Sequence, residues 1–141
     1  KQLLDAPIEL LDGVADTIDL LAERYRLLVI TKGDPIDQHR KVSDCGMTHH
    51  FWGVEVVAEK NPATYRTVLE RHGVRPEAFT MVGNSVPSDI LPVLTVGGRA
   101  VHIPHHTTWQ HETVEPSAIG TVFPVLDSFS DLPDFLDRLA G

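Results

Sequence analysis

The sequence predicts an α/β fold in which a parallel sheet is covered by helices on both faces. Short apolar runs alternate along the chain with segments whose apolar residues recur at helical spacing. The apolar runs lack a period-two pattern of polar side chains, which is typical of strands that are buried on both faces. With 141 residues, the chain has the size of one domain with a real core.

The first third of the chain predicts a helix, a strand and a second helix. Apolar residues recur at helical spacing over about 13–24, and Asp12 can cap that helix. Residues 25–30 are mostly aliphatic, which favours a short buried strand. A turn follows, and Pro35 begins a short helix that runs to about Val42.

The rest of the chain repeats this alternation. Residues 54–58 predict a second strand, and Asn61 and Pro62 begin a helix that ends at Gly73. The remaining elements, in order, are a strand at 79–82, a helix around 90–94, a strand at 100–103, a long polar loop at 104–120, a short strand at 121–123 and a helix capped by Ser130. Linkers and internal repeats are not evident, so one domain is expected.

Composition narrows the classes of partner. The formal net charge is −8, and an acidic surface repels both nucleic acid and anionic lipid. No apolar stretch approaches the roughly 20 residues that a membrane-spanning helix requires. The single cysteine, Cys45, cannot form an internal disulfide, which favours a cytoplasmic protein. We therefore expect neither a nucleic-acid nor a membrane partner.

Polar side chains follow three of the predicted strands. The run Leu27–Ile30 ends on the hydroxyl of Thr31, and Lys60 stands two residues beyond the strand 54–58. The segment Met81–Asp89 is an apolar run, a Gly-Asn-Ser turn and then a carboxylate. Ligands of parallel α/β sheets bind beyond the carboxyl ends of the strands. These three side chains are therefore expected to converge there.

Thr31, Lys60 and Asp89, in this order, resemble motifs two, three and four of the haloacid dehalogenase-like (HAD) phosphohydrolases. The resemblance runs from about Leu11 to the last helix and implies a Rossmann-like three-layer sandwich. It implies that Thr31 hydrogen-bonds the transferring phosphoryl group and that Lys60 neutralises charge as a compact cation. It also implies that Asp89 holds Mg²⁺, directly or through water.

Four neighbouring residues are expected to complete this site. Lys32 and Gly33 follow Thr31 and are expected to contribute to substrate binding. Asn84 and Ser85 are expected to shape the metal-binding loop with Asp89. Asn84 stands where many family members carry an aspartate, and its carbonyl oxygen can still accept from a metal-bound water. The loss of one negative charge leaves a metal-free reaction open, as in the dehalogenase branch of the family.

The first motif of the family, an Asp-x-Asp strand end that carries the nucleophile, is not recognisable. None of five early aspartates follows an apolar strand with that spacing: Asp5, Asp12, Asp34, Asp37 and Asp44. We therefore expect residues 1–141 to form the C-terminal part of a HAD-like core, with the nucleophile strand and the cap upstream and the chain alone inactive. A missing central strand would leave two open sheet edges, which favours a homodimer or association with the upstream segment.

Three functions remain open at this point. The first is a Mg²⁺-dependent phosphatase that acts on a small phosphorylated metabolite through an aspartyl-phosphate. The second is a metal-free 2-haloacid dehalogenase, which would carry a lone nucleophilic Asp, and the third is an inactive module that self-associates. A zinc site among the clustered histidines is disfavoured by their spacing; these are His102, His105, His106 and His111, with Glu112.

Overall fold

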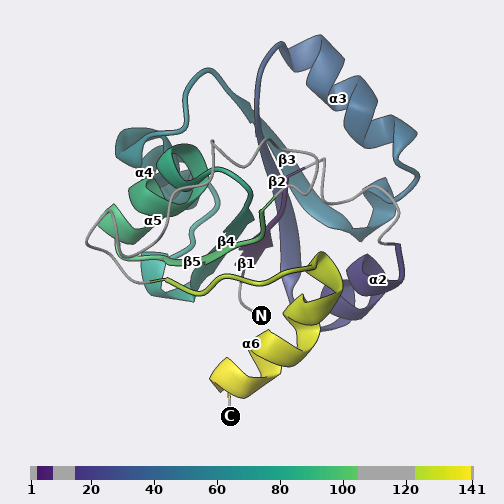
Figure 1. Ribbon diagram of the computed structural model, residues 1–141. Helices are drawn as coiled ribbons and strands as arrows, with labels where there is room; N and C mark the ends of the chain where they lie inside the picture. The colour runs from purple at the N-terminus through teal and green to yellow at the C-terminus, as the bar shows by residue number, and fades with distance from the viewer. Residues whose placement is uncertain (1–2, 8–14, 105–122, 141) are drawn as a thin grey trace.

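A computed structural model describes residues 3–7, 15–104 and 123–140 (Figure 1). Its centre is a five-stranded, all-parallel sheet with the strand order β3-β2-β1-β4-β5. The strands are β1 Leu3–Asp5, β2 Arg26–Lys32, β3 Phe51–Val57, β4 Phe79–Gly83 and β5 Arg99–His102. Within the described ranges, no helix is long and apolar enough to cross a membrane.

Helices cover both faces of the sheet, as Figure 1 shows. The α-helices are α2 Ala15–Arg24, α3 Pro35–Asp44, α4 Pro62–Arg71, α5 Leu91–Thr95 and α6 Leu132–Ala140. Shorter helical turns are η1 Thr48–His50, η2 Pro76–Ala78, the π-helix η3 Val86–Ile90 and η6 Phe129–Asp131. The predicted three-layer α/β arrangement is confirmed.

Two hydrophobic cores, one on each face, hold the layers together. Successive side chains of β2 point to opposite faces, so Leu27 and Val29 join the core that contains residues of α2 and α6. Leu28 and Ile30 join the second core, which contains residues of α4 and η3. Burial of both faces explains why the strands lack a polar alternation.

Helix caps fix the ends of the helices that follow β2 and β3. The side chain of Asp34 accepts a hydrogen bond from the backbone N–H of Asp37 at the start of α3. The side chain of Asn61 accepts from the N–H of Thr64 at the start of α4, and both helices carry Pro in the first turn. These caps hold the chain directly after Thr31 and Lys60.

The strand β1 corrects one of the predictions. Leu4 lies opposite Leu27 of β2 and Thr80 of β4, so the central position of the sheet is filled and its two neighbours have no open edge there. Leu3 and Leu4 are almost fully buried and enter opposite cores. Three residues are too few to form a recognisable strand pattern, so β1 could not be predicted from the sequence alone.

The C-terminal region differs in detail from the predictions. The 3-10 turn before α6 is capped by Ser128, whose side chain accepts from the N–H of Ser130. Most of the predicted loop 104–120 and part of the predicted strand 121–123 lie outside the described residues. Val125 forms an isolated parallel bridge with His102 at the edge of the sheet.

Candidate functional site

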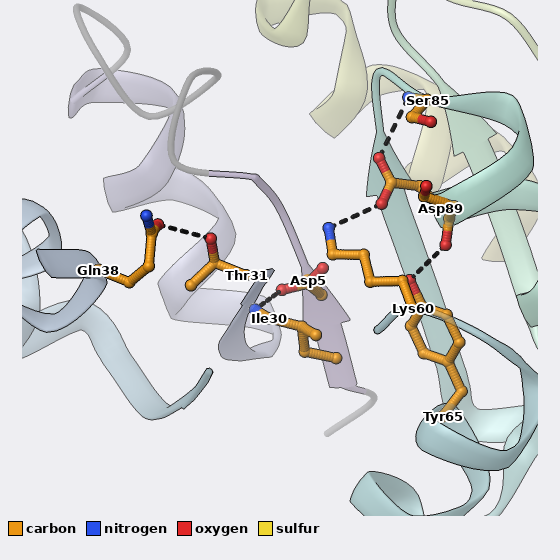
Figure 2. Close-up of polar contacts among 9 residues, drawn as sticks. Asp5, Ile30, Thr31, Gln38, Lys60, Tyr65, Ser85 and Asp89 are labelled. Atoms are coloured by element: carbon orange, nitrogen blue, oxygen red, sulfur yellow. Dashed lines mark hydrogen bonds and ion pairs between the residues drawn. The ribbon is translucent and has the colours of Figure 1, made fainter. Parts of the chain in front are cut away.

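The carboxyl edge of the sheet contains a buried ion pair. Lys60 Nζ lies 2.8 Å from Asp89 Oδ1, and the two side chains are only 10% and 2% exposed (Figure 2). Two of the predicted site residues are therefore brought into direct contact. A buried pair of this kind is strongly destabilising to break, because either charge alone would be left without compensation.

The backbone around Asp89 is shaped to hold its carboxylate. Asp89 Oδ2 accepts a hydrogen bond from the N–H of Ser85 at 3.1 Å. Asp89 lies in the π-helix η3, an element that often marks functional sites. A Cβ atom on Gly83 would lie 2.3 Å from the Cβ of Asp89, so only glycine leaves room for the carboxylate to fold over the end of β4.

Two buried side chains, Tyr65 and His102, hold the backbone of residues 84–88, which leads to Asp89. The hydroxyl of Tyr65, on α4, donates to the carbonyl oxygen of Ser88 at 2.9 Å. Burial raises the pKa of Tyr65 far above its ordinary value, so the hydroxyl keeps its proton. His102 Nε2 lies 3.3 Å from the carbonyl oxygen of Asn84, and burial lowers the pKa of this imidazole. The backbone on both sides of Ser85 is thus fixed.

Asp5, which its sequence context does not mark as a nucleophile, also lies at this edge of the sheet. It ends the apolar strand β1, is fully buried, and accepts from the N–H of Ile30 at 2.5 Å through Oδ1. Figure 2 shows it between the end of β2 and Lys60. Burial raises the pKa of Asp5 well above its usual range, against the opposing effect of the Lys60 ammonium. Two leucines before an acid are the only trace that this strand leaves in the sequence.

Thr31 lies on the other side of Asp5 from the ion pair, as Figure 2 shows. Its hydroxyl donates to Gln38 Oε1 of α3 at 2.8 Å. Sequence reasoning missed Gln38, which lies seven residues beyond Thr31 with no motif to mark it. Thr31 therefore reaches the predicted edge of the sheet, where a neighbouring amide already engages it.

The residues directly after Thr31 lie farther from the charged centre. Lys32 is exposed, and its ammonium pairs with Glu59 at 3.2 Å rather than with Asp89. Gly33 has a φ of +147° and donates its N–H to the carbonyl oxygen of Val57, which ties the ends of β2 and β3 together. Both residues lie at the exposed rim of the carboxyl edge of the sheet, where Lys32 pairs with Glu59 and not with Asp89.

The donor set fits Mg²⁺ better than a soft metal. Among the described residues, no three His, Cys, Asp or Glu side chains come together as a metal site, so a bound ion would rely on one or two carboxylates and on other oxygen donors. Asp5 Oδ2 is buried and has no hydrogen-bond partner. The negative charge of Asp89 contributes to the raised pKa of Asp5, so the two carboxylates influence each other. One or two carboxylates with phosphate and water are typical of protein-bound Mg²⁺. The half-buried Asn84 precedes this loop, and its carbonyl side chain is a suitable oxygen donor.

Of the clustered histidines, only His102 lies within the described residues. It is the last residue of β5, is 5% exposed, and packs its ring edge against Phe123. His105, His106, His111 and Glu112 lie outside the described ranges. His102 is thus a core side chain that supports the Asn84 loop.

Comparison with known proteins agrees with this geometry. A family model described as a haloacid dehalogenase-like hydrolase matches residues 2–96. A glyceraldehyde 3-phosphate phosphatase from Methanothermobacter thermautotrophicus is 32% identical over 126 residues, which cover 84% of this chain and 54% of that protein. The chain spans about half the length of the curated relatives that it matches over most of its own length.

Solved structures share the fold. A haloacid dehalogenase-like family hydrolase from Xanthomonas campestris is 32% identical, with a TM-score of 0.76 and coverage of 90% of this chain and 53% of that one. A HAD-hydrolase from Bacillus subtilis, solved bound to magnesium, has a TM-score of 0.72 at 19% identity and covers 88% and 54% of the two chains. The family match extends over more than half of the residues and includes β1 to β4 with the Lys60–Asp89 pair. The chain belongs to the haloacid dehalogenase-like hydrolases.

Proposed function

We propose that this chain is the C-terminal part of the core of a Mg²⁺-dependent phosphatase that acts on a small phosphorylated metabolite. The observation that carries the proposal is the buried Lys60–Asp89 pair beside the carboxylate that ends the central strand. An ammonium carries three N–H donors, so Lys60 can also donate to an incoming phosphoryl group while it stays paired with Asp89. The phosphatase relatives support this chemistry over other hydrolytic reactions.

The proposed reaction proceeds in two steps. A carboxylate supplied by a segment outside this chain attacks phosphorus, the ester P–O bond breaks, and the alcohol leaves with a proton from the second acid of that segment. Water then attacks the aspartyl-phosphate and releases inorganic phosphate and the carboxylate. Lys60 neutralises the phosphoryl oxygens, Thr31 donates a hydrogen bond to one of them, and Lys32 and Gly33 line the approach. Mg²⁺ would supply charge neutralisation when bound. The residues that would hold it are Asp89, Asn84, Ser85 and Asp5.

We propose further that Asp5 is not the nucleophile and that the nucleophile and the cap belong to a segment outside this chain. Asp5 is fully buried, so a substrate phosphorus cannot reach it in this arrangement. Its raised pKa favours the protonated form, which is a poor nucleophile. Pro7 stands two residues later, where the proposed phosphatase mechanism needs a second acid. In this view β1 occupies the place that the nucleophile strand would take.

A second candidate function follows from the same residues. If Asp5 did act as the nucleophile, it would be a lone acid followed by Ala6 and Pro7. A lone acid favours hydrolytic dehalogenation of a small 2-haloacid, in which the carboxylate displaces halide from carbon and water cleaves the resulting ester. The buried ion pair would then serve charge neutralisation without a metal.

The test combines two assays and two variants. The 141-residue chain is incubated with generic phosphate monoesters, with and without Mg²⁺, and separately with 2-chloropropionate. We expect release of neither phosphate nor chloride. Phosphate release that is abolished by Asp5→Asn would overturn the proposal of an outside nucleophile, and chloride release abolished by the same change would establish the second function. Glu59→Gln, at the exposed pair, is the matched control and should alter neither assay.

A further inference from the structure

The hydroxyl of Thr31 has one proton, and the structure directs it to Gln38 Oε1 at 2.8 Å. The proposed role of Thr31 requires the same proton to be donated to an ionised phosphoryl oxygen, which can only accept. The two acceptors therefore compete for one hydrogen bond. Whatever decides this competition also sets how strongly the edge of the sheet binds an anion.

Gln38 is held where it can serve Thr31 in either state. It lies half-buried on α3, whose first turn is fixed by the Asp34 cap. A Cβ atom on Gly33 would lie 3.0 Å from Gln38 Nε2 and 3.2 Å from its Cγ, so the glycine leaves the space that the amide occupies. The φ of +147° at Gly33 also disfavours any other residue there. The turn between β2 and α3 is therefore built around this amide.

We propose that Gln38 is a positioning residue that controls the direction of the Thr31 hydroxyl proton. In the structure, Gln38 Oε1 accepts that hydrogen bond. With an anion bound, the amide turns over, Nε2–H donates to Thr31 Oγ1, and the hydroxyl donates to the anion. No covalent bond changes in this exchange. An amide can do both because it carries a donor and an acceptor, whereas a carboxylate at neutral pH can only accept.

The inference rests on the proposed function, because it takes Thr31 as a ligand of the phosphoryl group. Its distinctive consequence is that Gln38→Glu fixes the hydroxyl proton away from the anion. The added negative charge also repels phosphate, and this second effect must be separated from the first. A double-mutant cycle with Thr31→Val separates them, since the repulsion is nearly the same in both backgrounds and the effect through the hydroxyl exists only with Thr31.

The experiment titrates inorganic phosphate into the isotope-labelled chain and follows backbone and side-chain amides by NMR. We expect Gln38→Glu to weaken phosphate binding about tenfold more when residue 31 is Thr than when it is Val, as loss of one charge-assisted hydrogen bond requires. Thr31→Ser should retain the coupling. His39→Glu, which adds the same charge on exposed α3 surface, should weaken binding equally in both backgrounds. The side-chain amide signals of Gln38 should also shift as phosphate saturates the wild-type chain.

Two contrary outcomes have different meanings. If phosphate shifts the amides of Thr31 and Lys60, but Gln38→Glu weakens binding equally in both backgrounds, Gln38 acts through charge alone and the inference is overturned. The proposed phosphate site would then stand. If phosphate perturbs neither amide in the wild-type chain, the proposed phosphate site itself fails, and the role of Gln38 fails with it.

Discussion

Two lysine–carboxylate pairs lie on the carboxyl side of the sheet, and they differ in almost every physical respect. Lys60 and Asp89 are 2.8 Å apart, with side chains 10% and 2% exposed. Lys32 and Glu59 are 3.2 Å apart, with side chains 53% and 68% exposed. Sequence motifs marked both lysines as site residues. The comparison teaches that burial, rather than proximity to a strand end, separates a charged centre from a solvated rim.

The difference has a cause in the surrounding chain. Lys60 precedes a capped helix whose Tyr65 is tied to the π-helix that carries Asp89. Lys32 ends β2 just before the turn at Gly33 and is free to extend into solvent. The inner pair is therefore organised in advance of any ligand, whereas the rim can rearrange when one arrives.

The largest expected effect comes from breaking the inner pair. Lys60→Met keeps the length of the side chain but leaves Asp89 buried without a counter-charge, so the free energy of unfolding should fall by about 3–5 kcal/mol. Lys32→Met, at the rim, should change it by less than about 0.5 kcal/mol. Urea unfolding monitored by circular dichroism measures both. Equal effects of the two substitutions would remove the distinction between centre and rim.

Gly83→Ala should be nearly as damaging, for a steric reason. The added methyl group would lie 2.3 Å from the Cβ of Asp89 and would push its carboxylate out of the inner pair, at a cost of about 3 kcal/mol. Gly46→Ala is the control, because open space surrounds Gly46 and the cost there is limited to about 1 kcal/mol of backbone strain at its positive φ. Thermal unfolding of the two variants checks the ranking. A smaller loss for Gly83→Ala than for Gly46→Ala would contradict this account of Asp89.

Tyr65→Phe removes only the hydroxyl that holds the Ser88 carbonyl. The free energy of unfolding should fall by about 1 kcal/mol, and hydrogen exchange should accelerate across η3 while the rest of α4 is unaffected. The matched control is Thr67→Val, which removes an exposed hydroxyl hydrogen bond on the same helix. Faster exchange in η3 for Thr67→Val as well would show that the effect is not specific to the Tyr65 contact.

The most gradual effect is a slope of stability with pH. The pKa of Asp5 is raised by burial, so the folded chain binds more protons than the unfolded chain between the unfolded and folded pKa values. Stability should therefore fall gradually as pH rises from about 4, the ordinary pKa of an aspartate, towards the folded value. Asp5→Asn should remove this component of the slope in metal-free buffer. An unchanged slope in Asp5→Asn would mean that Asp5 does not titrate as its burial requires.

Much of the fold follows from local patterns, and the exceptions have physical reasons. The capped start at Asn61 and Pro62 and the apolar runs of β2 and β4 were predictable because each is a local signal. The strand β1 was not, because its three residues become a strand only through pairing with two distant neighbours. Self-association was predicted because β2 and β4 would have open edges, and β1 pairs with both of those strands, which removes that reason.

The candidate site also contains residues that the local sequence predicts and residues that only tertiary contacts place there. Lys60 and Asp89 were predictable from motif order, and the structure joins them directly. The partner of Thr31 was not, because Gln38 reaches it only when α3 folds back over Gly33. The placement of Asp5 depends entirely on the sheet topology. Local motifs thus identify charged residues, whereas the partners of those residues depend on tertiary packing.

A Mg²⁺ titration of the chain and of Asp89→Asn, followed by NMR, tests directly whether Asp89 binds a metal ion. We expect saturable shifts of the Ser85 and Asp89 amides in the wild-type chain, with no comparable shifts around Lys32 and Glu59. Those shifts should be lost in Asp89→Asn. Absence of any Mg²⁺-dependent change at Ser85, or the same change in both proteins, would contradict the proposal that Asp89 is a metal ligand in a phosphatase core.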